Sequence, residues 1–387
     1  MEQFTVKDKV AIAGIGETTY YKRAQAPVSE FLLAVEAITK AADDAGIAVT
    51  DIDGFASYSN DRNDAARMAA ALGLPALRFA SMVWGGGGGG GSAAIADAAA
   101  AIVAGYANYV CVFRALAQGQ FVRFGQAPAA RTISGPFAYV LPYGMAVPAH
   151  WVALRTRRFM HEHGINQEPL AAVSLACYHH AQKNPRAVMH GHPLTREAYD
   201  KSRWIVEPFH LYDCCMENDG AAALILTSAE RARDLKRKPV YVMGAAQGSG
   251  YRHAASVENS PDYASSNFKS LAPRLFAMAG ITPRDVDVAQ VYEHFSGAVM
   301  VSLVEHGFCR ADEVMEFCTF ENFTGGKLPI NTSGGNLAEC YMHGLELVNE
   351  AVRQVRGTST SQVKDAEIAA VISGPMVAPV SDLLLHG

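Results

Sequence analysis

Apolar residues along the chain form two alternating patterns, short continuous runs and helical stripes. The first compact run, Lys9 to Gly16, reads KVAIAGIG and is typical of a strand buried on both faces. Ser29 then precedes a segment through Ala45 in which apolar side chains recur every three or four positions, and Gly46 stands where a helix C-cap is expected. The stripe consists of Phe31, Ala34, Val35, Ile38, Ala41 and Ala42. This alternation predicts an α/β protein.

Seven consecutive glycines, Gly85 to Gly91, join two segments of different character. Phe79 to Trp84 before them is extended in pattern, and Ala93 to Ala104 after them has high helix propensity. Glycine tracts are often flexible linkers, but these flanks predict a turn from a strand into a helix. Such a turn directs unpaired N–H groups and a helix dipole at one point, which suits an anion or a developing oxyanion. The alternative is a tight turn packed against a neighbouring backbone.

A sequence repeat divides the chain into two halves. Ala-Gly-Ile, Asp-x-Asp and Tyr occur at 45–47, 51–53 and 58, and again 234 residues later at 279–281, 285–287 and 292. Each copy is followed by a glycine-rich turn and a helix, which together span Gly85 to Ala104 in the first copy and Gly334-Gly335 through Arg353 in the second. An apolar strand then ends each copy, at Tyr109 to Phe113 or Ile368 to Ile372. The repeat predicts two similar α/β units packed as one pseudo-symmetric body, joined within 228–238.

The first half also contains an insertion, between Leu116 and His210, that the second half lacks. We expect residues 1–115 and 206–230 to form the N-terminal half, 116–205 an inserted loop and substrate domain, and 231–387 the C-terminal half. Aromatic residues of the insertion favour a bulky apolar substrate: Phe121, Phe124, Phe137, Tyr139 and Tyr143. Its histidine pairs, at 161 and 163, 179 and 180, and 190 and 192, lack the accompanying carboxylate or cysteine spacing of a zinc site, so no metal is expected.

Composition narrows the range of partners and compartments. The net charge is −5 with 18% charged residues, without a basic face or a long run of like charge, so neither nucleic acid nor a membrane surface is expected as a partner. The first ten residues are too charged for a signal peptide. The longest apolar stretch, Ala93 to Phe113, contains Asp97 and Asn108 and is too weakly hydrophobic to span a membrane. Seven cysteines without a C-x-x-C pair fit a reducing compartment, which predicts a cytoplasmic protein.

Three stretches carry a resemblance to a known superfamily. They are R-R-F-M-H-E-H-G at 157–164, D-C-C-x-x-x-D-G-A-A-A at 213–223 and T-S-A-E-R-A-R-D-L at 227–235. With the repeat, they make nearly the whole chain resemble the thiolase superfamily, and within it the thiolase-like branch related to sterol carrier protein X. The resemblance implies a thiolase fold, a five-layer αβαβα arrangement of two pseudo-symmetric halves with an inserted loop domain.

The chain departs from that family at every nucleophile position. Aligning the family's Cys-x-x-Gly-Ser with residues 88–92 places Gly88 at the nucleophilic cysteine, and the second family cysteine is missing from 373–375. Tyr341 replaces the histidine of the Gly-His-Pro motif, and Tyr292 replaces the first residue of Asn-Glu-Ala-Phe or His-Asp-Cys-Phe. Covalent acyl transfer through position 88 is therefore excluded, and the paired gain of two tyrosines indicates a changed chemistry.

Two tyrosines suit the cleavage of a carbon–carbon bond in a β-hydroxy-acyl-CoA. The reaction needs a base for the hydroxyl, donors for the thioester oxyanion and an acid that reprotonates carbon. We expect Tyr292 and Tyr341 to act as acid and base, with His294 assisting and His343 as a weaker candidate. The alternative is that both tyrosines are ordinary core residues. The glycines expected to bind the oxyanion or substrate are Gly88, Gly89, Gly335 and Gly374.

The resemblance also implies a substrate, products and a partner subunit, which the residues alone do not indicate. Members of this branch that lack the cysteine resemble retro-aldolases that shorten steroid side chains, releasing propionyl-CoA and a 17-ketosteroid. They pair as homodimers and bind a small subunit built of an OB-fold and a zinc ribbon, giving a heterotetramer. A CoA thioester is then the substrate, and zinc belongs only to the partner. The alternatives are a non-catalytic acyl-CoA or lipid-binding subunit, and a Claisen-type thiolase or acyltransferase for which Cys340 is the nearby thiol.

Overall fold

Two groups of strands, one from each half of the chain, form the framework of the protein. The computed structural model describes residues 6–59, 61–121, 133–253 and 260–387. The N-terminal group has the order β1 (Val10–Glu17), β8 (Asn218–Ser228), β5 (Tyr109–Ala117), β3 (Gly54–Tyr58) and β4 (Phe79–Val83), and β2 (Tyr21–Lys22) also pairs with β8. The C-terminal group has the order β10 (Val288–Val291), β11 (Ile368–Ser373), β12 (Val380–His386) and β9 (Val240–Gly248). A short antiparallel contact between β1 and β9 joins them.

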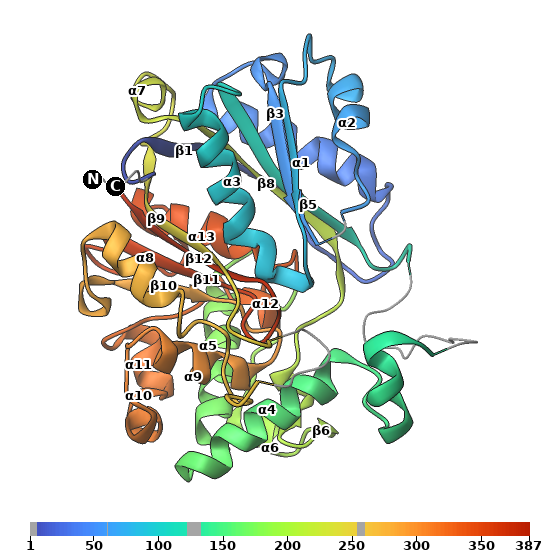
Figure 1. Ribbon diagram of the computed structural model, residues 1–387, viewed down its shortest axis with the longest axis vertical. Helices are drawn as coiled ribbons and strands as arrows, with labels where there is room; N and C mark the ends of the chain where they lie inside the picture. Colours follow the sequence, from blue (N-terminus) through green and yellow to red (C-terminus); the bar gives the residue numbers. More distant parts are fainter. Residues whose placement is uncertain (1–5, 60, 122–132, 254–259) are drawn as a thin grey trace.

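Helices cover both faces of each group and give five layers. α3 (Gly91–Val103) and α13 (Leu345–Arg356) form the middle layer, where each contacts strands of both halves (Figure 1). α1 (Glu30–Ala45) covers the outer face of the N-terminal strands, with α2 (Ala65–Leu72) beside it, and α8 (Ala272–Ala279) packs against β9 and β12. The predicted αβαβα arrangement is confirmed. Its physical reason is that apolar strands buried on both faces need a helix on each side.

The two halves use the repeated residues in the same way. Gly46 and Gly280 both end their helices in the left-handed conformation, with φ of 78° and 73°. The second aspartate of each Asp-x-Asp accepts hydrogen bonds from the backbone at the start of the next parallel strand: Asp53 from Tyr109, and Asp287 from Ile368, both at 2.9 Å. The predicted internal repeat is therefore a structural repeat.

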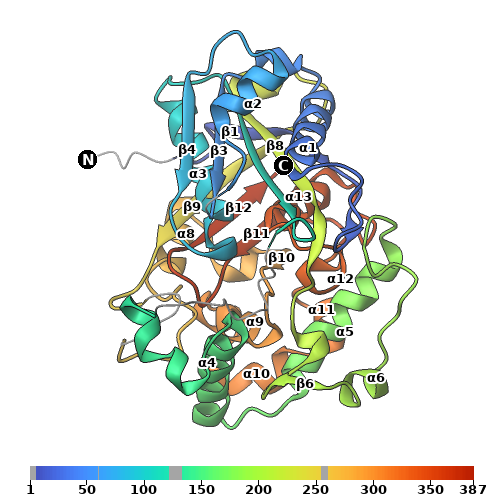
Figure 2. The same cartoon turned by 90° about the vertical axis from the view of Figure 1, so that its right-hand side faces the viewer.

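Each half carries an insertion of its own. The chain between β5 and β8 contains α4 (Pro148–His163), α5 (Glu168–Lys183), α6 (Arg196–Asp200), β6 (Trp204–Val206) and β7 (Phe209–His210). The C-terminal half adds α9 (Ser296–Glu305), α10 (Val314–Phe317) and α11 (Phe320–Gly325), a second insertion that the sequence reading missed. Both lie at the lower end of the molecule in Figure 1 and Figure 2. The predicted domain boundaries, which separate 116–205 from the rest, stay a prediction.

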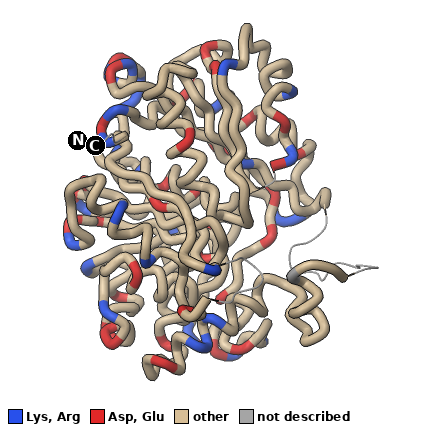
Figure 3. The backbone as a smooth tube through the Cα atoms, viewed as in Figure 1, with Lys and Arg blue, Asp and Glu red and all other residues tan. Residues whose placement is uncertain are grey.

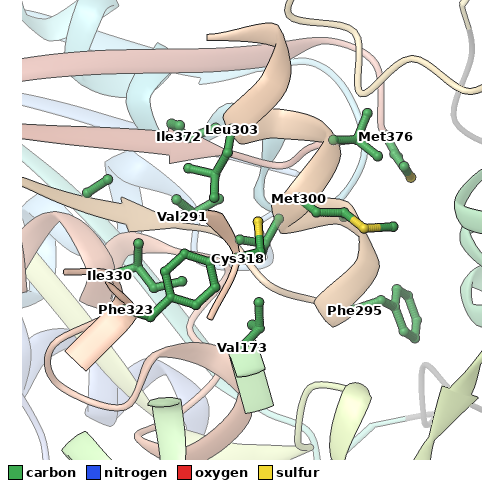
Figure 4. Close-up of a cluster of buried hydrophobic side chains, with 14 of the residues drawn as sticks. Val173, Val291, Phe295, Met300, Leu303, Cys318, Phe323, Ile330, Ile372 and Met376 are labelled. Atoms are coloured by element: carbon green, nitrogen blue, oxygen red, sulfur yellow. The ribbon is translucent and has the colours of Figure 1, made fainter. Parts of the chain in front are cut away.

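A shared hydrophobic core holds these helices against the C-terminal strands. Figure 4 shows Val173 of α5, Met300 of α9 and Phe323 of α11 in one cluster with residues of β10 and β11. Cys309 and Cys318 are buried in the same core. The insertion is therefore packed onto the C-terminal half, although it belongs to the N-terminal half in sequence.

The surface has mixed charge. Lys and Arg alternate with Asp and Glu around the molecule (Figure 3). Within the described residues, no single helix is both long and apolar enough to cross a bilayer, although the bent pair formed by 137–143 and α4 together meets the criteria of length and composition.

Candidate active site

Three loops bring the predicted site residues together in the middle layer. Residues 85–91 enter α3 through a 3-10 turn (Gly87–Gly90), 292–295 follow β10, and 339–344 precede α13. The hydroxyl oxygens of Tyr292 and Tyr341 are 2.7 Å apart, and the Gly88 N–H donates to the Tyr292 hydroxyl at 3.2 Å. The Tyr341 N–H donates to Asn218 Oδ1 at 2.7 Å, which fixes the loop that carries it.

Tyr292 occupies the space that a side chain at position 88 needs. A Cβ atom added to Gly88 would lie 2.0 Å from Cε2 and 2.4 Å from Cζ of Tyr292. A cysteine at this position and a tyrosine at 292 therefore exclude each other sterically. The missing nucleophile and the new tyrosine are one linked change in the architecture of the site.

The loop that carries Tyr341 lies within the segment expected to hold a glycine-rich turn and a helix, Gly334-Gly335 through Arg353. The structure has a short α12 (Gly335–Ala338), a loop at 339–344, and then α13. Gly334 and Gly344 have φ of 114° and 86°, which is a conformation that favours glycine and interrupts a helix. The interruption turns Tyr341 toward the glycine loop.

The first amides of α3 are paired, contrary to the expectation of unpaired N–H groups. The Ser92 N–H donates to Ser373 Oγ at 3.3 Å, and the Ala93 N–H donates to Ser381 Oγ at 3.0 Å. Both hydroxyls come from the C-terminal half. The Gly88 amide differs from these two, because it donates to the hydroxyl of Tyr292, a candidate catalytic group.

The four candidate glycines fall into two places. A Cβ added to Gly374 would lie 2.2 Å from the Gly89 nitrogen, so the loops of Gly88, Gly89 and Gly374 are in direct backbone contact. Gly335 instead faces Glu293, since a Cβ there would lie 1.7 Å from its Oε1. Gly335 thus makes room for a buried carboxyl group. Binding of an oxyanion or substrate by these glycines stays a prediction.

Both tyrosines are almost completely buried, with 1% of Tyr292 and 7% of Tyr341 exposed. Burial raises the pKa of both phenols well above the usual value; the neighbouring Tyr341 raises that of Tyr292 further, and the Cys215 thiol that of Tyr341. Both are therefore protonated at neutral pH. Proton transfer by this pair has to be concerted, because neither phenolate is available in advance.

The two histidines flank the tyrosines and are neutral. The His294 ring centroid is 5.3 Å from that of Tyr292, and burial, reinforced by Arg155, lowers the pKa of His294 to about 3. Its ring nitrogens have no well-aligned hydrogen bond within the described residues, and the Tyr292 backbone offsets its burial only in part. Burial and then Arg114 lower the pKa of His343 well below its usual value. Neither histidine is a cationic acid at neutral pH.

His343 is fixed by a cation. Arg114 Nε donates to His343 Nδ1 at 3.2 Å, and the same arginine forms a buried ion pair with Asp61 at 2.8 Å. The His343 ring centroid lies 5.1 Å from that of Tyr341. All four predicted catalytic residues are thus gathered at one point, with His343 held by the N-terminal half.

A cysteine that the sequence reading passed over lies beside the pair. The Cys215 thiol is in hydrogen-bonding contact with Tyr341, and the Cys215 N–H donates to the His294 carbonyl at 2.9 Å. Cys340, expected to be the nearby thiol, is fully buried, and burial raises its pKa well above the usual value. Cys215 lies in the D-C-C motif at 213–215, which was read only as a family signature. Cys215 is therefore a thiol in contact with the pair, and burial raises the pKa of both thiols, which makes each a poor nucleophile.

The insertion aromatics that favoured an apolar substrate lie on the surface wherever the structure describes them. Phe121, 43% exposed, packs under the guanidinium of Arg62 at 3.7 Å, and Tyr139 and Tyr143 are largely exposed. Phe124 lies outside the described residues. Over the described part of the chain, no three His, Cys, Asp or Glu side chains gather as a metal site would require. How the insertion contributes to substrate choice stays a prediction.

The chain is similar to proteins of known activity over nearly its full length. It is 41% identical over 383 residues to the steroid side-chain-cleaving aldolase of Thermomonospora curvata, covering 97% of each chain. It is 40% identical over 387 residues to the 17-hydroxy-3-oxo-4-pregnene-20-carboxyl-CoA lyase of Mycobacterium tuberculosis, covering 97% of this chain and 99% of that one.

Solved structures and a domain family agree with that similarity. The structure described as Ltp2-ChsH2(DUF35) aldolase matches with a TM-score of 0.92 at 39% identity, covering 99% of this chain and 98% of that one. A monomeric SCP2-thiolase-like protein from Mycobacterium smegmatis, with a TM-score of 0.74 at 19% identity over 98% of this chain and 78% of that one, shares the fold. The Thiolase C-terminal domain-like family matches residues 248–379.

Proposed function

The chain belongs to the family of the steroid side-chain-cleaving aldolases, and from that premise we propose that it is a carbon–carbon lyase acting on a β-hydroxy-acyl-CoA. The reaction is a retro-aldol cleavage to a ketone and propionyl-CoA or a similar short acyl-CoA. No covalent acyl-enzyme forms. The observation that carries the proposal is the tyrosine pair, whose ring at 292 fills the place of a nucleophile at position 88.

The hydrogen-bonded pair is suited to relay one proton. One tyrosine takes the proton of the substrate's β-hydroxyl as its own proton passes to the other tyrosine, across the 2.7 Å contact. In the same concerted step the bond between Cα and Cβ breaks, the ketone leaves, and the electron pair develops enolate character in the thioester. The second tyrosine gives its own proton to Cα as it receives the proton of the first. The proton count is balanced, and no free phenolate is needed at any stage.

The surroundings of the pair favour one direction of the relay. The Gly88 N–H donates to the Tyr292 oxygen and so stabilises negative charge there. Tyr292 is then the group that receives the hydroxyl proton, and Tyr341 is the acid that protonates carbon. His294 and His343, neutral and adjacent, act by position and polarity, with no ionisation of their own.

A small partner subunit completes this proposal. One similar solved structure is described as an aldolase with a DUF35 protein. By that likeness we propose that this chain forms a homodimer and binds a small OB-fold subunit with a zinc ribbon. Zinc would belong to that subunit alone.

Product analysis tests the activity and the partner together. The chain, alone and after coexpression with a DUF35 subunit, is given 17-hydroxy-3-oxo-4-pregnene-20-carboxyl-CoA without free CoA, and products are identified by mass spectrometry. We expect a 17-ketosteroid and propionyl-CoA in equal amounts, with a higher rate in the complex. A rate proportional to added CoA would favour thiolysis, and binding without any product would favour the non-catalytic subunit.

A further inference from the structure

The middle-layer helix α13 carries polar side chains that a buried helix normally lacks. Residues 345–355 are all buried, yet Glu346, Asn349, Glu350 and Arg353 recur at spacings of three and four and therefore share one face. Buried charges are costly unless they are paired or have a function. We call this face, with the facing side chains Glu17 and Glu339, the α13 polar stripe.

The inner end of the stripe lies at the tyrosine pair. Glu346 follows Gly344, where an added Cβ would lie 2.8 Å from the Tyr292 ring. Its carboxyl group interacts electrostatically with Tyr292 and Tyr341 and also with the acidic groups of Glu293 and Glu339. Neither oxygen has a hydrogen bond of normal geometry in the described parts of the chain. Burial raises the pKa of Glu346 well above its usual value, although the backbone amides of Glu346 and Met342 oppose the shift.

The outer end of the stripe reaches a surface cleft. Asn349 Nδ2 donates to Glu17 Oε1 at 3.2 Å, and Arg353 is ion-paired with the same carboxylate. Glu17 lines a cleft of about 920 Å³ together with Tyr20 and Arg186. The Arg186 guanidinium lies 3.6 Å from both Glu17 and Glu339. The stripe is therefore open to solvent at one end and closed at the tyrosines.

Between the two ends, several buried oxygens lack a hydrogen bond of normal geometry. Among the described residues these are Glu339 Oε2, Asn349 Oδ1 and both oxygens of Glu346. Buried polar atoms in such a cluster require water or a shared proton. Burial also raises the pKa of Glu339, so that its carboxyl group can hold a proton near neutral pH.

We propose that the α13 polar stripe is a proton path between the cleft and the tyrosine pair, with Glu346 as its inner end. The inference rests on the proposed function. Cleavage returns the hydroxyl proton to carbon and needs no path. When the short acyl-CoA is bound without a ketone, however, the proton taken from Cα has no acceptor within the pair. The tyrosine that receives it passes its own proton through bridging water to the Glu346 carboxyl group, which releases a proton toward Glu339 in turn, and the proton leaves through the cleft.

Deuterium exchange separates this path from the cleavage reaction. The active complex is incubated with propionyl-CoA in D₂O without ketone, and deuterium at Cα is followed by mass spectrometry. In parallel, the cleavage rate is measured with the steroid thioester. We expect Glu346→Gln, which preserves size but removes the exchangeable acid, to lower the ratio of exchange rate to cleavage kcat by about 10-fold or more. Glu339→Gln should lower the same ratio.

Glu293→Gln is the matched control, because Glu293 is equally buried and adjacent to Tyr292 but lies off the stripe. Its ratio should stay within about 3-fold of the wild type. Equal losses of exchange and cleavage in Glu346→Gln, undiminished exchange in both stripe variants, or no exchange by the wild type would each overturn the path. Failure of the wild type to cleave the steroid thioester would instead refute the proposed function, because exchange is measured independently.

Discussion

Tyr58 and Tyr292 occupy equivalent positions in the two halves, and their hydroxyls make opposite connections. Each lies at the end of the equivalent strand, β3 or β10, and reaches the loop that opens the other half's middle helix. Tyr58 donates to the carbonyl of His343 at 3.0 Å, and the Met342 carbonyl is 3.3 Å away. Tyr292 instead accepts from the Gly88 N–H. The strand end and its contact with the opposite loop are repeated, but the direction of the hydrogen bond is reversed.

That difference determines which tyrosine is available for chemistry. A phenol that donates to a carbonyl has its proton committed, and burial raises the pKa of Tyr58 well above its usual value. Tyr292 has its oxygen stabilised by an amide, and its proton is shared with Tyr341. The N-terminal half thus supplies a structural tyrosine and a donor amide, and the C-terminal half supplies the reactive pair.

The comparison is tested most strongly by removing single hydroxyls. Tyr292→Phe and Tyr341→Phe should each lower kcat by about 10² to 10⁴, because acid–base groups contribute on that order, while the Tm changes little. The double variant should be far less than multiplicatively worse, since both residues serve one relay. Turnover and Tm of the purified complexes provide the measurement.

Tyr58→Phe is the control for that test. It removes a buried hydrogen bond and should lower the free energy of unfolding by about 1 to 2 kcal/mol, with kcat within about 3-fold of the wild type. If Tyr58→Phe loses as much turnover as Tyr292→Phe, the two halves do not differ in chemistry. Unchanged turnover in both site variants would remove the tyrosine pair from the mechanism.

A side chain at Gly88 should disrupt the tyrosine pair from the glycine loop, without changing either tyrosine. In Gly88→Ala the new Cβ would overlap the Tyr292 ring, so overpacking should destabilise the protein by about 1 to 3 kcal/mol and displace the reactive hydroxyl. Gly91→Ala is the matched control in the same loop, because the φ of Gly91 is −58° and an added Cβ would lie at an ordinary 3.4 Å from Ser373 Oγ. The measurement is the Tm and kcat of both variants.

A second substitution identifies the cause. In a Tyr292→Ala background the ring is gone, and Gly88→Ala should then cost much less free energy of unfolding than it does alone. An equal cost in both backgrounds would show that the steric exclusion between positions 88 and 292 is not what destabilises the variant.

Sequence reasoning succeeded where the signal is local or repeated. The alternation of strands and helices, the glycine caps and the paired aspartates follow from periodicity and spacing, and the resemblance placed Tyr292 and Tyr341 in facing loops. Hydrogen bonds between residues far apart in the sequence were not predicted. Ser373 and Ser381 satisfy the first amides of α3 from almost 300 positions away, and no local pattern announces such partners. Cys215 was missed for the same reason, because only the folded chain brings it to Tyr341.

The break between α12 and α13 shows a different limit. The segment 337–345 contains Glu339, Tyr341 and His343 among apolar and small residues, and no local pattern marks where α12 ends. Gly344, at a positive φ of 86°, ends the loop before α13, and the Tyr292 ring fills the space beside it. Tertiary contacts of the other strand end override the local helix preference.

The last effect we expect depends on pH and concerns Glu293, which stands at the position equivalent to Ser59 in the N-terminal half. Burial raises the pKa of Glu293 to about 7, from an ordinary value of 4.5. Between these two values the folded state holds a proton that the unfolded state has released, so the free energy of unfolding falls as pH rises from about 4.5 to about 7. The loss is fully present above that window and amounts to about 3 kcal/mol at most.

Glu293→Gln cannot ionise, so its Tm should fall less than that of the wild type between pH 5 and pH 8. The exposed Glu316→Gln is the control for simple loss of charge and should follow the wild type. Parallel curves of Tm against pH for the wild type and Glu293→Gln would mean that this carboxyl titrates equally in the folded and unfolded chain. The tested difference between the two strand ends would then lie in their tyrosines.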